Sequence, residues 1–457
     1  MRFKIDRGLR NILILSWGFM FTFSSFQTMS NTQKNLLDAV EKDKPNFTGD
    51  GYISLAIVFI VFGMALFFSP MYGTLISTQL SIFIGALCNL VFTVIFFWPE
   101  KTLLYFGSAI QGIGNALMWV SSGRALTENS KSTTISRNAG IFWATFQLSL
   151  VTGNLFVYFT FNGKTFDETT RKTILVTLTI LSTIGCGIFT ALKSPPLIES
   201  DKTSSDKNDK IENEEINDCS FNSSWLRMKN AALLVFTQNM MLLSISFLYT
   251  GLVIAFYTGV YTSLVGFTVK LGEIRKRLVN LTGVAIGIGA SVGATFSGSV
   301  APRFKILSNS SSCLVIGFLA QIICYTITYL NFPNNAPFKD TEDIGVITPM
   351  PILAIIGGIF LGFGDSCINI QIYNILGTIY KEDIAPAFAF FCFCQSIAVT
   401  LSFIGSNYIG LHLQLMTFIV VGIVGIGCFI FVNFKTMPIT DETTVVEKYT
   451  EKNNCKV

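Results

Sequence analysis

Charged residues are scarce in this chain. Asp, Glu, Lys and Arg make up 13% of its 457 residues, whereas hydrophobic residues make up 51%. A soluble helical protein needs polar faces on its helices, and such faces are missing, because every Lys and Arg can be assigned to a tail, a loop or a helix end. The composition therefore argues against a soluble protein, and the net charge of +4 does not indicate a nucleic-acid partner.

Groups that carry chemistry are also sparse. The one histidine, His412, has no acidic or cysteine companions, and most of the ten cysteines lie inside apolar segments, where they suit packing. Glycine-rich stretches such as "GIGAS" (287–291) lie in apolar segments too, where small residues let helices approach closely. We find no metal-ligand spacing, catalytic triad or phosphate loop, so we expect no metal, no cofactor and no enzymatic activity.

Apolar windows of about 20 residues, the length that crosses a bilayer, are abundant. We predict twelve transmembrane helices, six on each side of a polar break, and hence an all-α multi-pass protein embedded in the lipid bilayer. The predicted spans are 11–30, 51–73, 77–97, 102–126, 138–161, 173–192, 232–262, 278–302, 308–331, 350–379, 383–408 and 413–434.

The spans divide the chain into two halves of similar length. We predict an N-terminal tail (1–10), a six-helix bundle (11–192), a polar linker without stable structure (193–231), a second six-helix bundle (232–434) and a C-terminal tail (435–457). Lys and Arg are more frequent on the side that holds the tails and the linker, which places both termini in the cytoplasm. No sorting motif distinguishes the plasma membrane from an internal one.

One glycosylation sequon lies in the first loop on the far side of the membrane. The stretch "NFT" begins at Asn46, where a sugar can be attached in a lumenal or extracellular compartment. The alternative is an unused sequon.

The two halves repeat one another. "GIGNA" in the fourth span lines up with "GFGDS" in the tenth, which aligns Asn115 with Asp365. The fifth and eleventh spans align in the same way, with Gln147 on Gln395. Two parallel repeats are the plan of the major facilitator superfamily, whose substrate sites lie near the midplane between the halves.

Several longer stretches resemble one branch of that superfamily. "FMFTFSSFQTMSNTQ" (19–33), "SRNAGIFWATFQLSLVTGN" (136–154) and "GFGDSCINIQIYNILG" (362–377) are similar to the uncoordinated-93-like family. The resemblance covers the chain apart from its linker and tails. It implies a twelve-helix fold whose first, fourth, seventh and tenth helices line a central cavity. The family is named for an ion-channel regulatory protein, and another relative escorts innate immune receptors, so a channel or receptor partner is also implied.

The sequence departs from the superfamily pattern in the fourth span. "SAIQGIGNA" carries Ser108 where proton-coupled members have Arg, which argues against proton antiport of the usual kind.

Asp365 is the one acid well inside a predicted span. A helical wheel places Asn369 on the same side of the helix. An ionised carboxylate at mid-bilayer costs about 2.5–3.5 kcal/mol, so such acids usually pair or face water. Because no Lys or Arg occupies the centre of another span, we expect Asp365 to be protonated or bonded to neutral amides. Asn115, Gln147 and Gln395 are the candidates.

Two interpretations of Asp365 remain open. It belongs either to a site for a solute or a coupling ion, or to a structural clasp that holds the halves together. Gln27 and Trp119, with Asn115, can line the same cavity or simply pack between helices. The Phe residues of the third, fifth and eleventh spans are expected to face lipid.

Arg124, Glu128 and Arg137 flank the cytoplasmic loop between the fourth and fifth spans. They form either a gate-like salt bridge or ordinary solvated loop charge.

Two functions fit these features. One is a transporter that moves a small neutral or weakly charged solute by alternating access. The other is a non-transporting accessory protein that regulates an ion channel or escorts a membrane receptor.

Overall fold

The computed structural model describes residues 6–44, 46–68, 76–130, 135–160, 168–194, 235–301, 304, 310–380 and 384–436. These residues are almost entirely helical, apart from loops and an isolated bridge between Thr268 and Thr341. The elements are α1 (Arg7–Asp43), α2 (Gly51–Phe67), α4 (Thr78–Ile95), α5 (Lys101–Glu128), α6 (Ile135–Thr160), α7 (Glu168–Phe189), α10 (Gln238–Ala255), η2 (Phe256–Val260), α11 (Tyr261–Phe267), η3 (Val269–Leu271), α12 (Arg275–Thr295), η4 (Phe296–Val300), α13 (Ser310–Asn331), α14 (Pro351–Ile379), α15 (Ile384–Gly405) and α16 (Leu411–Thr436).

The helices have the length and composition of membrane spans. Within the described residues eleven are long and apolar enough to cross a bilayer, and α2, with 17 residues, is a shorter apolar helix. The all-α multi-pass prediction is confirmed. Most of the predicted linker and C-terminal tail lies outside the described residues, so the domain boundaries stay predictions.

The first span is much longer than its predicted range of 11–30, because α1 continues to Asp43. The added turns carry polar side chains such as Asn31, Gln33 and Asn35, all of which are buried. Polar residues end an apolar window, but here protein surrounds them instead of lipid, so the helix continues.

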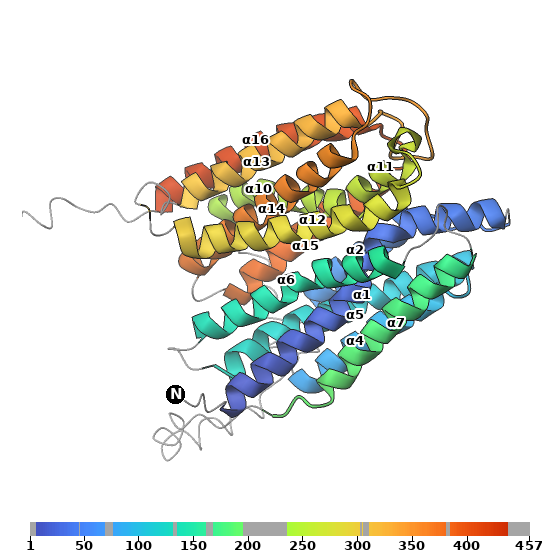
Figure 1. Cartoon of the computed structure of the whole chain (residues 1–457). Coiled ribbons are helices and arrows are strands. Elements are labelled where there is room, and N and C mark those ends of the chain that lie inside the picture. The colour runs from blue at the N-terminus through green and yellow to red at the C-terminus, as the bar shows by residue number, and fades with distance from the viewer. Residues whose placement is uncertain are drawn as a thin grey trace, which may run out of the picture.

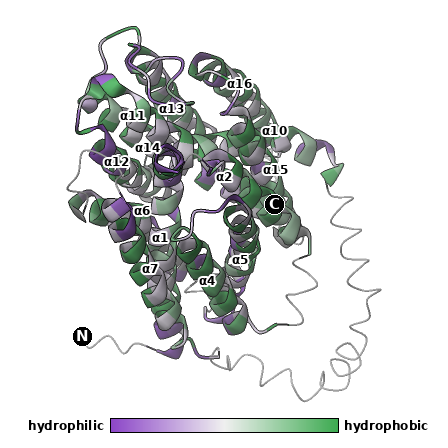
Figure 2. Ribbon diagram, turned by 90° about the vertical axis from the view of Figure 1, so that its right-hand side faces the viewer, coloured by the Kyte–Doolittle hydropathy of each residue, from purple (hydrophilic) through white to green (hydrophobic). Residues whose placement is uncertain are grey.

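The helices form two bundles (Figure 1). One contains α1, α2 and α4–α7, and the other contains α10–α16. Figure 2 shows hydrophobic residues along the helices and hydrophilic ones gathered toward their ends, as a bilayer requires. Each bundle has its own buried cluster, which includes Phe19 and Phe92 in the first and Phe256 and Phe418 in the second.

The bundles meet along two helix pairs. α2 packs along α15 and α6 along α12, while α1 contacts η2 and α11. Tyr52 and Leu55 of α2 and Leu150 of α6 belong to the buried cluster of the second bundle. The interface is therefore part of the core and not a surface contact.

Glycines bring α12 and α14 close together, as the "GIGAS" stretch predicts. A Cβ on Gly289 would collide with the carbonyl oxygen of Ile359, and one on Gly362 with the carbonyl oxygen of Ile286. The two backbones are thus in direct contact, which fixes the position of α14 and its acid.

The seventh span is not a uniform α-helix. α10 widens into the π-helical turn η2 and then continues as α11. The Thr262 hydroxyl, just beyond the π turn, donates to the carbonyl of Asn31 on α1 at 2.8 Å. Single π turns in long helices often mark functional positions, and this one lies at the contact between the bundles.

Candidate functional site

Asp365 lies in α14, where its carboxylate is bonded to an amide one turn away. Asn369 Nδ2 donates to Asp365 Oδ1 at 2.9 Å and to the Asp365 carbonyl at 3.0 Å. Gln395 Nε2 of α15 donates to Asn369 Oδ1 at 3.3 Å and to Thr250 Oγ1 of α10 at 3.0 Å. These four residues form a polar chain across three helices of the second bundle, here named the Asp365 chain.

The opposite face of α14 is closed. Gln371 Nε2 donates to Ser297 Oγ of η4 at 2.7 Å, and the Cys367 thiol donates to the carbonyl of Gly293 at 3.6 Å. Both side chains are buried. The Asp365 side, in contrast, is turned toward the other bundle, because the ring of Tyr373 lies 5.9 Å from that of Trp143 on α6.

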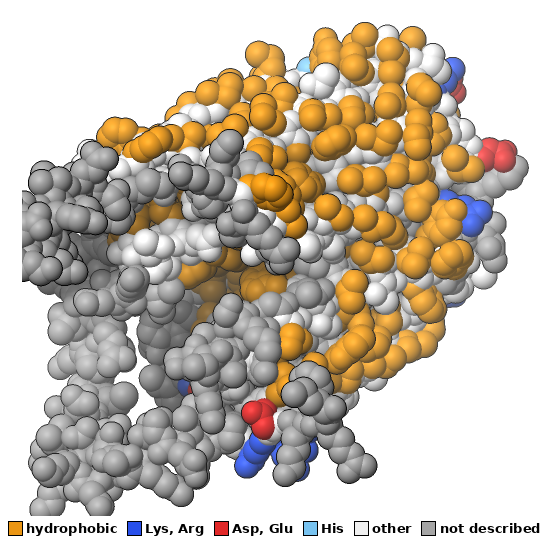
Figure 3. All heavy atoms as spheres, turned by 60° about the vertical axis from the view of Figure 1, so that its left-hand side comes forward, with side chains coloured by type: hydrophobic (Ala, Val, Ile, Leu, Met, Phe, Trp, Pro, Cys, Tyr) orange, Lys and Arg blue, Asp and Glu red, His pale blue; other side chains and the backbone are white. Residues whose placement is uncertain are grey.

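Asp365, Asn369 and Tyr373 are each partly exposed, although they lie within the bundle. Protein interiors are close-packed, so we interpret the partial exposure of these side chains as the border of a hollow. The space-filling view shows the surface hollowed between the two halves, with hydrophobic side chains in the recess (Figure 3).

Aromatic rings form the wall of the first bundle that faces this region. Trp119 of α5 stacks on Trp143 with ring centroids 5.7 Å apart, and Phe146 lies edge-on to Trp119 at 5.2 Å. Trp119 and Trp143 are partly exposed, whereas Phe146 is buried. The expectation that Phe in the third, fifth and eleventh spans faces lipid is wrong for Phe92 of α4, Phe146 of α6 and Phe391 of α15, because these rings pack inside the bundles.

The amides predicted for the first bundle have partners of their own. Asn115 Oδ1 accepts from Gln111 Nε2 at 2.9 Å, and Gln27 Oε1 accepts from Ser149 Oγ at 2.9 Å. Gln147 is partly buried on α6. Within the described residues none of the three is bonded to Asp365, whose partner is Asn369 instead. The structure thus joins Asp365, Asn369 and Gln395 and leaves Asn115, Gln27 and Gln147 outside that chain.

The predicted cytoplasmic gate has its described contacts inside the first bundle. Arg124 Nη2 lies 3.7 Å from Glu128 Oε1, one turn along α5. Glu128 also accepts from Thr78 Oγ1 of α4 at 3.2 Å. Arg137 is on α6, and its side chain lies outside the described residues. The gate therefore stays a prediction.

Sequence reasoning missed an ionic cluster at one end of the molecule. This end, where the C-terminus of α1 and the N-terminus of α2 lie, is here named the closed end. Lys34 of α1 forms a salt bridge with Asp50, the N-cap of α2. Asn407, which follows α15, donates to Asp50 Oδ1 at 2.9 Å. Burial raises the pKa of the Asp50 carboxyl, but Lys34 and Asn407 outweigh burial and hold that pKa below its usual value.

A second ionic cluster lies at the same end. Asp340, in the loop between α13 and α14, accepts from Arg275 Nη1 at 2.5 Å and from Lys42 Nζ of α1 at 2.9 Å. The buried Lys276 donates to Asn35 Oδ1 of α1 at 3.0 Å. Burial raises the pKa of Asp340, and its cationic neighbours lower it by more, so the net shift is downward. Both clusters tie α1 or α2 to the second bundle.

The charged residues of these two clusters lie at the ends of apolar runs in the sequence. At such positions they are indistinguishable from ordinary solvated loop charges. Asp50 carries one signal that could have singled it out, since "GD" directly before an apolar run is typical of an N-cap. Nothing local in the sequence links Asp50 to Asn407.

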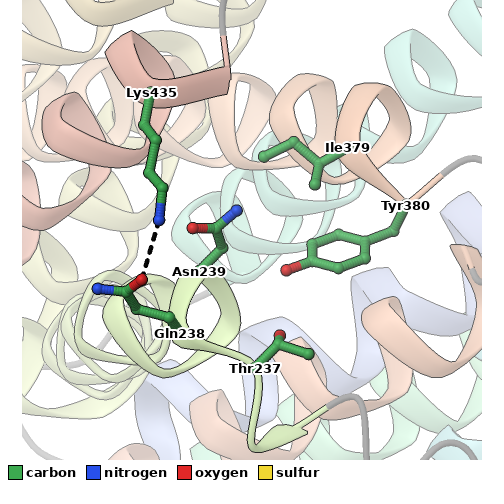
Figure 4. A pocket seen from close by; sticks show the side chains of 6 residues that line it. All are labelled: Thr237, Gln238, Asn239, Ile379, Tyr380 and Lys435. Atoms are coloured by element: carbon green, nitrogen blue, oxygen red, sulfur yellow. Dashed lines mark hydrogen bonds between the residues drawn. The ribbon is translucent and has the colours of Figure 1, made fainter.

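A separate pocket of about 310 Å³ lies at the far end of α14, between the start of α10 and the end of α16 (Figure 4). Its lining residues are Thr237, Gln238, Asn239, Ile379, Tyr380 and Lys435. Lys435 Nζ donates to Gln238 Oε1 at 2.9 Å across it. Ile379 is fourteen residues beyond Asp365, which corresponds to about 21 Å along a helix, so this pocket is distinct from the Asp365 chain. The described residues contain no group of three His, Cys, Asp or Glu side chains that could hold a metal.

Comparison with known proteins places this arrangement in a family. Residues 46–430 match the sequence profile described as "Ion channel regulatory protein UNC-93". The chain belongs to the UNC-93 family. It is similar to the UNC93-like protein MFSD11 of Xenopus tropicalis, with 33% identity over 94% of this chain and 97% of that protein. It is also similar to the mouse protein unc-93 homolog A, with 21% identity over 93% of this chain and 92% of that one.

Solved structures show the fold of this UNC-93 family chain. The peptide transporter POT superimposes with a TM-score of 0.63 at 13% identity, over 93% of each chain. The nucleoside transporter NupG superimposes with a TM-score of 0.62 at 12% identity, over 92% of this chain and 99% of that one. The fold is therefore that of the major facilitator transporters, with two six-helix bundles.

Proposed function

We propose that this UNC-93 family chain is a transporter that moves a small neutral or weakly charged solute across the membrane by alternating access. One observation carries the proposal. The described hydrogen bonds and ion pairs that join the bundles through Asp50 and Asp340 lie at the closed end. The partly exposed Asp365, Asn369 and Gln395 and the Trp119–Trp143 pair border a hollow between the bundles.

Alternating access requires a site that is closed at one end and open at the other. In this state the closed end is the one away from the start of α1, so the hollow opens toward the termini, which we place in the cytoplasm. Asp365, Asn369 and Gln395 provide hydrogen bonds to a solute. Gln27 and Gln147 add further amides at the border of the hollow, whereas Asn115 is buried.

An accessory role is the second candidate, and the family description supports it, since it names an ion channel regulatory protein. In that role the same fold binds a channel or receptor in the membrane, and the closed end is a permanent clamp. The Asp365 chain is then a structural clasp among three helices of the second bundle, and it does not hold the two halves together.

Uptake measurements separate the two functions. Asp365→Asn keeps the size of the side chain and removes its charge, so it should abolish uptake or ligand-induced stabilisation while leaving expression intact. Glu168→Gln, which changes an exposed acid at the start of α7, is the matched control and should behave like the wild type. Normal activity of Asp365→Asn would remove the site. Recovery of a specific membrane partner in near-stoichiometric amount, without uptake of any solute, would favour the accessory role.

A further inference from the structure

The charge of Asp365 has no counterpart in the described part of the chain. Its described partner is Asn369, whose amide is neutral. Within these residues no Lys or Arg forms an ion pair with it, and the salt bridges of the two bundles lie at helix ends or in loops. A carboxylate at this depth is stabilised when a cation reaches it, and the partly exposed side chain leaves one side open to the hollow.

The aromatic wall is the second, independent observation. Trp119 and Trp143 stack with an interplanar angle of 28°, and Trp143 reaches Tyr373 on the same helix as Asp365. All three rings are partly exposed. Ring faces attract cations and pack against apolar groups, so a ligand that lies along these rings carries an apolar body or a diffuse positive charge.

Spacing sets the size of the ligand. Tyr373 follows Asp365 by eight residues, which corresponds to about 12 Å along α14. A molecule that contacts both the carboxylate and the rings therefore extends along about two turns of the helix.

With Asp365 ionised, the chemistry of the walls argues against other ligand classes. An anion would be repelled by Asp365, and a dication would lack a second acid, because Asp365 is the one acid well inside a span. Ca²⁺ and Mg²⁺ take six or more oxygen ligands, whereas the Asn369 amide oxygen already accepts from Gln395. A neutral solute fits the protonated carboxyl, whereas a cationic solute supplies the counter-charge that the ionised carboxylate lacks.

We propose that the hollow binds a monovalent organic amine whose ammonium group lies on Asp365 and whose apolar body lies on Trp119, Trp143 and Tyr373. This inference rests on the proposed function for the identity of the site, and it names the class of solute. Gln395 and Asn369 orient the carboxylate, and the rings select an elongated apolar body.

Binding to the purified full-length chain in lipid nanodiscs tests the proposal. Three compounds share one skeleton and differ in charge: phenylbutylamine, phenylbutanol and phenylbutyrate. Intrinsic Trp fluorescence and thermal stability report binding, because Trp119 and Trp143 line the site. The amine should bind about tenfold or more tightly than the alcohol, as a hydrogen-bonded charge pair provides, and the carboxylate compound should bind more weakly than either. Equal binding of amine and alcohol to the wild type would overturn the proposal.

Variants locate the binding. Asp365→Asn should remove the preference for the amine over the alcohol. Trp143→Leu should lower the affinity for both compounds by a similar factor. Glu168→Gln should leave all affinities unchanged. A preference for the amine that persists in Asp365→Asn would overturn the assignment. If that variant does not fold, equal binding of amine and alcohol to the wild type still overturns the proposal, and Trp143→Leu still tests the contact with the rings.

Failure of this inference can be distinguished from failure of the proposed transport function. Amine binding that depends on Asp365, without exchange of labelled amine across proteoliposomes, would support the ligand class and argue against transport. Transport of a neutral or anionic solute without amine binding would support transport and overturn the ligand class.

Discussion

Asn407 donates a hydrogen bond to Asp50 at 2.9 Å, and this contact joins the end of α15 to the start of α2. Asp50 also holds Lys34 and caps its own helix by accepting from the Ile53 amide at 2.8 Å. One carboxylate therefore fixes three segments from both bundles.

Replacing Asn407 should weaken the closed end. A hydrogen bond to a charged group contributes about 1.5 kcal/mol or more, so Asn407→Ala should raise the population of molecules open at this end by about tenfold. Spin labels on the exposed residues Glu41 and Glu342, one in each bundle, report the separation by pulsed electron paramagnetic resonance. The distance distribution should shift to longer values. Tyr408→Ala, at the exposed neighbouring position, is the control; if it shifts the distribution equally, the bond to Asp50 is not the cause.

The closed end should withstand mild acid. The pKa values of Asp50 and Asp340 both lie below the ordinary value of an aspartate because their cationic partners outweigh burial. A lowered pKa in the folded state means that the contribution to closure is present above that pKa and is lost as the pH falls through it. The label separation should therefore stay constant from pH 7 to about pH 4, near the unperturbed aspartate value, and increase only below that. An increase between pH 7 and 5 would contradict the assignment.

Close helix contact makes Gly289 intolerant of a side chain. Gly289→Ala places a Cβ against the Ile359 carbonyl and should destabilise the protein by about 1–3 kcal/mol, the usual effect of overpacking. Gly298→Ala, further along the same span, is the matched control, because a Cβ there would meet no heavy atom within 4 Å. Thermal unfolding in detergent measures the stability of both variants. Equal melting temperatures would show that α12 can move away from α14.

Gln395 tests whether the Asp365 chain is a clasp or a site. Gln395→Leu removes two donated hydrogen bonds and leaves Asn369 and Thr250 without these partners, at a cost of about 1–3 kcal/mol. If the chain is only a clasp, Gln395→Leu and Asp365→Asn should lower the melting temperature by similar amounts and leave ligand binding unchanged. If it is a site, Asp365→Asn should affect binding far more than stability. Asn374→Ala, on the exposed side of α14, controls for the loss of an amide.

The glycosylation sequon at Asn46 tests the orientation of the chain in the membrane. It lies in an exposed turn after α1, at the closed end. If this end faces the lumen or the outside, a glycosidase should increase the gel mobility of the wild type and leave Asn46→Gln unchanged. An N-terminal epitope tag should then be reached by antibody only after permeabilisation. A tag that is accessible on intact cells would invert the topology.

Much of the fold could be predicted from the sequence, because a bilayer imposes a simple rule. Apolar windows indicated the helices, and the aligned "GIGNA" and "GFGDS" stretches indicated the two bundles. The rule fails where protein replaces lipid as the surroundings of a helix. Buried Asn31 and Gln33 extend α1 well beyond its apolar window, and Phe146 faces other rings instead of lipid.

The candidate site was predicted in part. Helical spacing placed Asn369 on the same side of the helix as Asp365, and the two are bonded. Gln395 was expected to bond Asp365 itself, and it bonds Asn369 instead. The pairing of Asp50 with Asn407 could not be found in this way, since it depends on how the two bundles meet and the two residues lie 357 positions apart. Local patterns carry no information on that distance.

The shared core has a consequence for how the protein is made. Tyr52 and Leu150 fill a cluster that belongs mainly to the other bundle, so neither six-helix unit buries all of its own apolar contacts alone. The ribosome completes the first unit well before the second, and during that interval the faces of α2 and α6 are uncovered. Two fragments divided between residues 194 and 235 should therefore assemble when they are produced together. Each fragment produced alone should be bound by chaperones and degraded by proteases.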